Sequence, residues 1–358
     1  MHGYAHGDIR LAHRDSWAGS GSATVATRED REVTEHAVLS PLATRSRGAG
    51  RRAIDEPPDP FRLCFERDRD RILHSPAFRR LAGKTQVFVF PDDHQRTRLT
   101  HALEVAQIAG SVARALGLNV ALTEAIALGH DCGHGPGGHA SEDALSPFVE
   151  GGYDHATWGA DVTLEPLNLC AETLDGIRNH SWSRPAPATP EGEVVSWADR
   201  IAYVCHDFED AVAAGVVGTE DVPDGVQAYC GTTRTHQLRA FITAMIDATA
   251  TTGRIGMTAP LADALAEFRQ FNYERVYMRE SSVAQARAVI DLLRALVEAY
   301  AANPRLLPGK RDTAAGSEAA VRDAVAYVGG MTDRFACRQG VALLGWTRDR
   351  LPRGIDVW

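Results

Sequence analysis

Four residues in the middle of the chain have side chains that suit a divalent metal. They are His101, the adjacent pair His130 and Asp131, and Asp199. Two neutral imidazoles and two carboxylates make a mixed nitrogen and oxygen site, which favours Mn²⁺, Fe²⁺, Zn²⁺, Ni²⁺ or Co²⁺ over Ca²⁺. A single histidine is more often structural, but this ordered set predicts a metal with open positions for water and a phosphate oxygen. Such an ion lowers the pKa of water and polarises phosphorus.

A second group of chemically active residues follows the glycine-rich turn after Asp131. If a helix begins near His139, then His139 and Glu142 lie three residues apart on one face. A carboxylate beside an imidazole fixes its tautomer and favours its protonated form, which suits a general acid or base. His134 and His155 lie near this pair in sequence. The alternative is that some of these histidines only satisfy backbone carbonyls.

A third group is a helical stripe that continues from Asp199. Asp199, Tyr203 and Asp207 recur every four residues, so they share one helix face. Tyr203 and Asp207 would line the pocket beyond the metal and suit a sugar ring with its hydroxyl, and Arg200 could reach a phosphate. By itself such a stripe is more often a half-exposed helix face.

Mostly helical elements must position these residues, so we expect a mainly α protein. The apolar periodicity predicts helices. Their ranges are Thr100 (as N-cap) to about Leu116, Val120 to Asp131, Ser141 to Val149, and about 193–214, 260–276 and 282–301. Val87 to Phe90 is the best strand candidate. We expect a mobile N-terminus over 1–38, one large core domain with a short β element over 39–301, and a C-terminal extension over 302–358 that packs on the core.

Composition narrows the class of protein further. The 358 residues include no apolar run long enough to span a membrane and no apolar signal peptide. Six cysteines without a C-x-x-C pair favour a reducing cytoplasm. The net charge of −9 argues against a nucleic-acid-coating protein. Residues 45–98 nevertheless carry thirteen Lys or Arg against eight Asp or Glu, which suits a pocket for a polyanionic small molecule; paired charges on a solvated face explain part of it.

Two tempting nucleotide motifs fail. Gly83-Lys84-Thr85 resembles the end of a phosphate-binding P-loop, but Phe78 stands where the first glycine is required. The glycines between 133 and 138 follow no strand and do not form G-x-G-x-x-G, so a dinucleotide-binding fold is unsupported.

With these residues in hand, the chain resembles the deoxynucleoside triphosphate triphosphohydrolases, the dGTPase-like branch of the HD-domain superfamily. The H…HD…D order of the four metal candidates is the signature of that superfamily. The likeness covers about Leu39 to Ala214, with one further familiar segment from Phe271 to Tyr277. Its motifs are Arg67 to Ser75, Phe78 to Leu81, Lys84 to Phe88, Thr97 to Ala109, His130 to His134, Thr173 to Ile177 and Ala198 to Tyr203.

The resemblance implies hydrolysis of a dNTP to a deoxynucleoside and inorganic triphosphate, with attack at the α-phosphorus. Mg²⁺ would accompany the triphosphate, and family members often form homo-oligomers. Carried over by position, the metal ligands are His101, His130, Asp131 and Asp199. Arg98 and His134 would hold phosphates, and His139, oriented by Glu142, would protonate the leaving 5′ oxygen. The remaining matches are His155 as an active-site histidine, Tyr203 and Asp207 against the deoxyribose, and Gln86 near the base.

The chain also departs from the family pattern. Gly137 stands where the family has a phenylalanine before the glycine and histidine, so the turn loses an aromatic packing group. The same site could serve another nucleotide phosphohydrolase of the superfamily, such as a 5′-nucleotidase or an alarmone hydrolase. A weakly catalytic nucleotide-sensing module is a second alternative, and the His139–Glu142 pair disfavours it. Binding of single-stranded nucleic acid by residues 45–98 is a third.

Overall fold

The protein is mainly α-helical, as the sequence predicts. The structure, a computed structural model, describes residues 4–6, 8–15, 24–91, 94–309 and 312–353. The helices are α1 Arg28–Val38, α2 Cys64–His74, α3 Pro76–Arg80, α4 Arg98–Leu116, α5 Val120–Gly129, α6 Ala140–Leu145, α7 His155–Trp158, α8 Ala171–Arg178, α9 Pro190–Ala213, α10 Asp224–Cys230, α11 Arg234–Thr252, α12 Ala259–Asn272, α13 Glu280–Ala302, α14 Glu318–Gly329 and α15 Asp333–Leu344. None of them is long and apolar enough to cross a membrane.

The strand predicted at Val87–Phe90 is wrong. The strands of the described residues are β1 (Tyr4–His6) and β2 (Ile9–Leu11), which pair antiparallel near the N-terminus. Residues 86–90 form bends, and an isolated bridge joins Thr85 to Thr97 instead. The apolar side chains of this segment pack against the two hydrophobic clusters of the molecule, so burial rather than strand pairing explains its composition.

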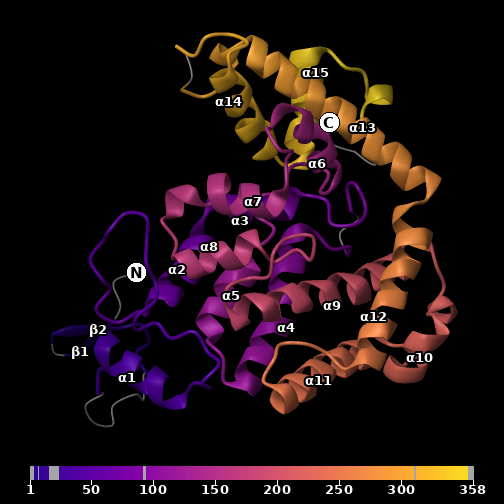
Figure 1. The fold of residues 1–358 in the computed structure, drawn as a ribbon. Helices are drawn as coiled ribbons and strands as arrows, with labels where there is room; N and C mark the ends of the chain where they lie inside the picture. The colour runs from indigo at the N-terminus through magenta and orange to yellow at the C-terminus, as the bar shows by residue number, and fades with distance from the viewer. Residues whose placement is uncertain (1–3, 7, 16–23, 92–93, 310–311, 354–358) are drawn as a thin grey trace.

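Three helices, α4, α5 and α9, form the centre of the molecule and carry the predicted metal ligands (Figure 1). Helix α2 packs against α5, and Phe65 and Ile72 from α2 are fully buried there with Ile126. Helix α4 begins at Arg98, two residues before the predicted N-cap Thr100. The Thr100 hydroxyl instead accepts from the backbone N–H of Thr97, so it caps the first turn from inside the helix.

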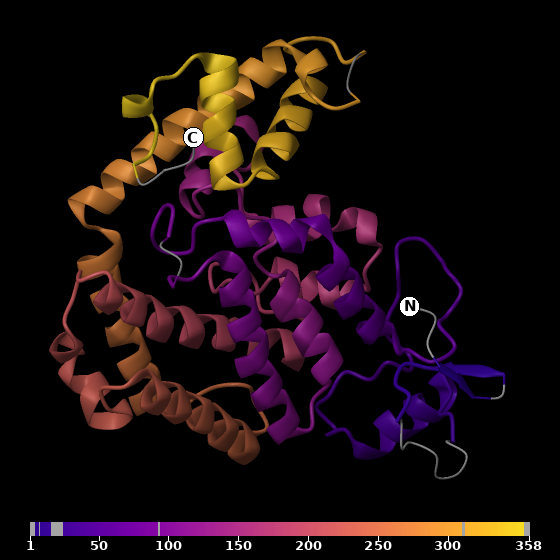
Figure 2. The same cartoon turned by 180° about the vertical axis from the view of Figure 1, so that it is seen from behind.

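A second hydrophobic cluster holds the C-terminal helices together. Helices α13, α14 and α15 pack with α6 around buried residues such as Leu293, Leu296 and Val328. Figure 2 shows this group as a lobe at the opposite end of the molecule from α11, with the long α13 running into it. The lobe therefore uses α6, the helix next to the glycine turn, as part of its own core.

Helix α1 lies inside the segment for which the sequence predicts no element. Thr27 caps its first turn by accepting from the Asp30 N–H. Near its end the buried Glu35 carboxylate accepts from Ser46 N at 2.6 Å and from Asn119 Nδ2 at 2.8 Å. These bonds dock α1 on the start of α5, an interaction that no periodicity in the sequence reveals.

Candidate metal centre

The four predicted metal ligands come together from three helices. His101 lies on the first turns of α4, His130 and Asp131 follow the last turn of α5, and Asp199 lies midway along α9. His101 Nε2 is 3.0 Å from Asp199 Oδ1 and 4.0 Å from Asp131 Oδ2. His130 Nε2 is 3.5 Å from Asp131 Oδ1 and 3.6 Å from Asp199 Oδ1. Ligand atoms from residues 98 positions apart thus surround one small volume.

His130 fits a metal because of its tautomer. Its Nδ1 lies 2.7 Å from the carbonyl oxygen of Ala127, and a carbonyl only accepts, so Nδ1 carries the proton. The buried Nε2 has no hydrogen-bond partner among the described residues. Burial opposes a charge here, yet Asp131 and Asp199 raise the pKa of His130 to about 9. The site therefore favours a positive charge at Nε2, which a divalent ion would supply.

Asp131 is held in its ionised form by its neighbours. Burial opposes ionisation, but Arg98 and His130 lower the pKa of Asp131 well below its usual value. Arg98, predicted to hold a phosphate, donates to Asp131 Oδ2 at 2.8 Å, and both side chains are buried. His134 Nε2 lies 3.3 Å from Asp131 Oδ1. Arg98 and His134 thus adjoin the metal set and orient one of its carboxylates.

The glycine turn is fixed by close backbone packing. A Cβ on Gly133 would lie 1.9 Å from His155 O and 2.5 Å from Gly159 N, so only glycine fits there. The buried Lys84 ammonium donates to the carbonyl oxygens of His134 and Gly329. Burial lowers the pKa of Lys84 to about 7. The turn therefore has a rigid path although it lacks the aromatic residue typical of the family.

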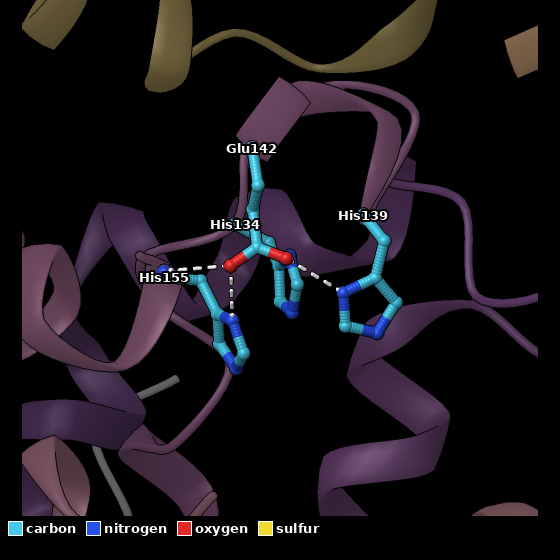
Figure 3. A group of neighbouring side chains, drawn as sticks. All are labelled: His134, His139, Glu142 and His155. Carbon is cyan, nitrogen blue, oxygen red and sulfur yellow. Dashed lines mark hydrogen bonds and ion pairs between the residues drawn. The ribbon is translucent and has the colours of Figure 1, made fainter. Parts of the chain in front are cut away.

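The second predicted cluster also assembles, as Figure 3 shows. The Glu142 carboxylate lies between two imidazoles, with His139 Nδ1 at 2.7 Å and His155 Nδ1 at 2.8 Å. Burial opposes its charge, but these two hydrogen bonds lower the pKa of Glu142. The ring of His134 stacks on that of His155 with centroids 3.7 Å apart. The His139 side chain is 73% exposed, so its Nε2 is open to a substrate.

One further histidine belongs to this group and was missed by the sequence analysis. His180 follows α8 and is buried, with Nδ1 2.8 Å from Ile177 O and Nε2 3.2 Å from His155 Nε2. Its ring meets that of His130 edge-on, with centroids 4.9 Å apart. Burial and the neighbours His130 and His155 lower the pKa of His180 to about 4, so the ring is neutral. The crowding of histidines between residues 94 and 206 was the available signal.

The predicted stripe on α9 shares one face, but its polar atoms bind residues of other helices. The Tyr203 hydroxyl accepts from Arg269 Nε at 3.0 Å. Asp207 is buried, and its Oδ2 accepts from the Tyr277 hydroxyl at 2.6 Å. Burial raises the pKa of Asp207 to about 7. Both residues thus face α12 and the turn that follows it, because their partners are Arg269 and Tyr277.

Arg200 and Gln86, the two remaining predicted substrate contacts, lie in different surroundings. The Arg200 guanidinium stacks on the Trp182 ring at 3.5 Å from its centroid. The amide oxygen Oε1 of Gln86 is buried and lacks a hydrogen-bond partner within the described ranges. Such an atom is suited to accept a hydrogen bond from a ligand, as the predicted base contact requires.

Comparison with known families finds two matches along the chain. Residues 98–204, which include all four metal candidates, match the HD domain. Residues 255–340 match the phosphohydrolase-associated domain. The HD match begins where α4 begins, covers α5 and ends within α9, five residues after Asp199, so it includes the parts of the three helices that hold the site.

Relatives match over most of the chain. A deoxyguanosinetriphosphate triphosphohydrolase-like protein from Caldanaerobacter subterraneus is 41% identical over 86% of this chain and 93% of its own length. A protein with the same description from Clostridium perfringens is 36% identical over 87% and 96%. One from Deinococcus radiodurans is 36% identical over 89% and 100%.

Solved structures resemble the fold at low sequence identity. A hypothetical protein from Aquifex aeolicus has a TM-score of 0.50 and 17% identity over 79% of this chain and 69% of that one. A phosphohydrolase from Bacteroides thetaiotaomicron has a TM-score of 0.50 and 18% identity over 76% and 68%. The identity and coverage of the relatives show the family. The chain belongs to the deoxyguanosinetriphosphate triphosphohydrolase-like family, whose HD domain is that of a metal-dependent phosphohydrolase.

Proposed function

We propose that the protein hydrolyses a deoxynucleoside triphosphate to a deoxynucleoside and inorganic triphosphate, by attack of water at the α-phosphorus. The observation that supports this most is the adjacency of a metal-binding set to a carboxylate-anchored histidine. His134 links the two groups, with Nε2 at 3.3 Å from Asp131 and its ring 4.9 Å from that of His139. A general acid beside a metal centre suits cleavage of a phosphate ester with a poor leaving group.

His101, His130, Asp131 and Asp199 would hold a divalent metal. When bound, the metal supplies an activated water and polarises the phosphate. Burial, Arg98 and His155 lower the pKa of His134 well below its usual value, so His134 is neutral. It orients Asp131 or donates a hydrogen bond to phosphate rather than bringing charge. Arg98 places its guanidinium beside the metal site, where a triphosphate oxygen would lie.

His139 would deliver the proton to the leaving 5′ oxygen. Its Nδ1–H is donated to Glu142, which leaves Nε2 as the atom that faces solvent and substrate. Glu142 is ionised and partly shielded, so it fixes the tautomer and the orientation of the His139 ring, and Nε2 is the atom that would pass a proton to the leaving oxygen. The deoxynucleoside then leaves as an alcohol, while the triphosphate remains on the side of Arg98.

Tyr203 and Asp207 would select the sugar. Tyr203 lies one helical turn from Asp199, and its bond to Arg269 fixes the hydroxyl, so the ring has a set position. A ring packed against the 2′ carbon would leave no space for a ribose hydroxyl. Asp207 would then accept from the 3′ hydroxyl of the deoxyribose.

Product analysis tests this proposal directly. The purified protein is incubated with Mn²⁺ and Mg²⁺, first with each dNTP alone and then with all four together, and the products are separated by ion-exchange chromatography. Release of a deoxynucleoside with intact triphosphate supports the proposal. Release of orthophosphate or pyrophosphate would mean another phosphohydrolase, and no turnover with either metal would favour a nucleotide-sensing role.

A further inference from the structure

Two cysteines that are 106 residues apart in the sequence lie beside each other at the starts of two helices. Cys64 is the first residue of α2, and Cys170 is the N-cap of α8. The Cys170 Sγ atom lies 3.9 Å from the Cys64 carbonyl oxygen. A Cβ built on Gly50 would lie 2.6 Å from Cys64 Sγ and 3.6 Å from Cys170 Sγ, so the two sulfur atoms are at most about 6 Å apart. Two thiols placed in this way are candidates for a disulfide between α2 and α8.

The backbones of the two helices are already joined at this point. The buried Asp68 carboxylate on α2 accepts from Cys170 N at 2.8 Å and from Thr173 Oγ1 at 2.7 Å. These bonds hold the first turn of α8 against α2. A bond between the two sulfur atoms would therefore join segments whose relative position is fixed in the folded protein.

The two thiols differ in reactivity. A hydrogen bond from the Cys170 thiol lowers the pKa of the Cys64 thiol, although burial opposes this shift. Cys64 also lies in the first turn of α2, where the helix dipole favours a thiolate. The same hydrogen bond, together with burial, raises the pKa of Cys170, so that thiol keeps its proton. Cys64 is therefore the better nucleophile of the pair.

The two thiols also differ in access from solvent. Cys64 is partly buried and lines a hollow of about 260 Å³ together with Gly50, Arg51 and Arg52. Cys170 is fully buried behind it. A small oxidant can therefore reach the Cys64 sulfur, and the oxidised sulfur then lies next to the Cys170 thiol.

We propose that Cys64 and Cys170 form a redox site that hydrogen peroxide oxidises to a reversible disulfide. The Cys64 thiolate attacks one peroxide oxygen and the O–O bond breaks, which gives a sulfenic acid on Cys64 and a hydroxide ion. The hydroxide takes the proton that Cys64 lost on ionisation and becomes water. The Cys170 sulfur then attacks the Cys64 sulfur, the S–O bond breaks, and the hydroxyl group leaves with the Cys170 proton as a second water. Two thiols are oxidised and one peroxide is reduced.

The disulfide would enclose most of the candidate metal set. His101, His130 and Asp131 lie between residues 64 and 170 of the chain. Closing this long loop restricts the unfolded chain, so the oxidised protein should resist unfolding more than the reduced protein does. A reversible disulfide of this kind is compatible with a compartment that is usually reducing. The inference goes beyond the proposed function and depends on neither the metal nor the substrate.

Peptide mapping tests the site directly. The full chain is treated with hydrogen peroxide, its free thiols are alkylated in denaturant, and its peptides are analysed by mass spectrometry with and without dithiothreitol. We expect a linked Cys64–Cys170 peptide pair and a urea midpoint higher by about 1 M, and dithiothreitol should reverse both. Cys170→Ser should stop at the sulfenic acid on Cys64, which dimedone captures. Cys337→Ser is the matched control, because Cys337 is also buried and burial raises its pKa to about 12, and this variant should form the disulfide as the wild type does.

Unlinked Cys64 and Cys170 in the wild type, at a peroxide excess that oxidises a small free thiol in the same sample, would overturn the inference. So would equal formation of a Cys205–Cys230 disulfide, because both of those thiols are buried and burial raises the pKa of each. Their oxidation would show that peroxide acts on unfolded protein. If circular dichroism shows that Cys170→Ser is unfolded, the peptide map of the wild type alone decides.

Discussion

At the scale of single residues, a backbone carbonyl decides what His130 can do. The Ala127 carbonyl oxygen accepts a hydrogen bond from His130 Nδ1–H, which leaves Nε2 free for a metal. We expect His130→Ala to lose bound metal and to lower the rate of hydrolysis at least about a thousandfold, while the helical core persists. Metal analysis, kinetics and far-ultraviolet circular dichroism check the three parts. Full activity in a variant that is folded and metal-free would remove His130 from the site.

Tyr203 carries the prediction on sugar selection. Tyr203→Ala should raise activity on ribonucleotides relative to deoxyribonucleotides by about tenfold or more, because the alanine leaves room for a 2′ hydroxyl. Tyr203→Phe is the matched variant, since it keeps the ring and loses only the bond to Arg269. The ratio of kcat/KM for dNTP and NTP is the measurement. An unchanged ratio in the alanine variant would place Tyr203 outside the sugar pocket.

Asp207 gives the protein a pH dependence that can be measured. Burial raises its pKa to about 7 in the folded state, from about 3.8 in the unfolded chain. Between these two pKa values the folded state binds more protons than the unfolded chain does. The contribution of Asp207 to the free energy of unfolding is therefore fully present below about pH 4 and is lost as the pH rises through about 7.

Asp207→Asn should remove that decline, which amounts to a few kcal/mol between about pH 4 and 7. Urea unfolding of variant and wild type across this range is the comparison. Asp263→Asn, at an exposed position on α12, controls for the loss of a carboxylate. Parallel stability curves for Asp207→Asn and wild type would show that Asp207 is ionised throughout.

The grouping of the four candidate ligands could be predicted from the sequence, because His130 and Asp131 are adjacent and the ordered H…HD…D set is a recognisable signature. The place of His180 beside this set could not be predicted, because it depends on a contact with His155, 25 residues away, and on a hydrogen bond to the carbonyl of Ile177. The sequence also left the partners of Tyr203 and Asp207 open, because they come from residues 269 and 277. The chemical roles of all these residues stay predictions until the variants are measured.

At the scale of elements, the long amphipathic helices α4, α9 and α13 could be predicted because periodic apolar residues recur over several turns. The short run Val87–Phe90 was wrongly predicted to be a strand. An apolar segment of four residues is as compatible with irregular backbone between two hydrophobic clusters as it is with a strand. Helix α1 was missed because its docking depends on Glu35, a buried carboxylate, and not on an apolar face.

The glycine turn gives the prediction at this scale. Gly133→Ala would push a methyl group into His155 O and the backbone of Gly159, so the turn and α7 must separate. We expect a loss of about 3 kcal/mol or more in the free energy of unfolding. Gly256→Ala is the control, because no atom lies within 4 Å of its added Cβ and its φ is not positive. Equal unfolding midpoints for the two variants would contradict the packing of the turn.

At the scale of the whole molecule, the site lies where two hydrophobic clusters meet. The HD helices belong to the first, whereas α6 belongs to the second together with α13, α14 and α15. Asp333, at the start of α15, accepts from Thr85 N at 2.9 Å, from Thr85 Oγ1 at 2.6 Å and from Gly137 N at 2.9 Å. The C-terminal lobe therefore holds both the turn that carries His139 and the segment before α4.

This contact predicts that a residue far from the metal affects turnover. Asp333→Ala leaves three buried donors without an acceptor, so we expect a loss of about 3 kcal/mol in stability and a fall of about tenfold in kcat. Asp333→Asn keeps one acceptor oxygen and should lie between, and Glu318→Ala, on the exposed face of α14, should change neither. Urea unfolding and steady-state kinetics measure both effects.

If Asp333→Ala lost stability but kept its kcat, the lobe would support the fold without positioning His139. A fall in kcat at saturating metal, with metal content unchanged, would instead identify the lobe as the support of the proton donor.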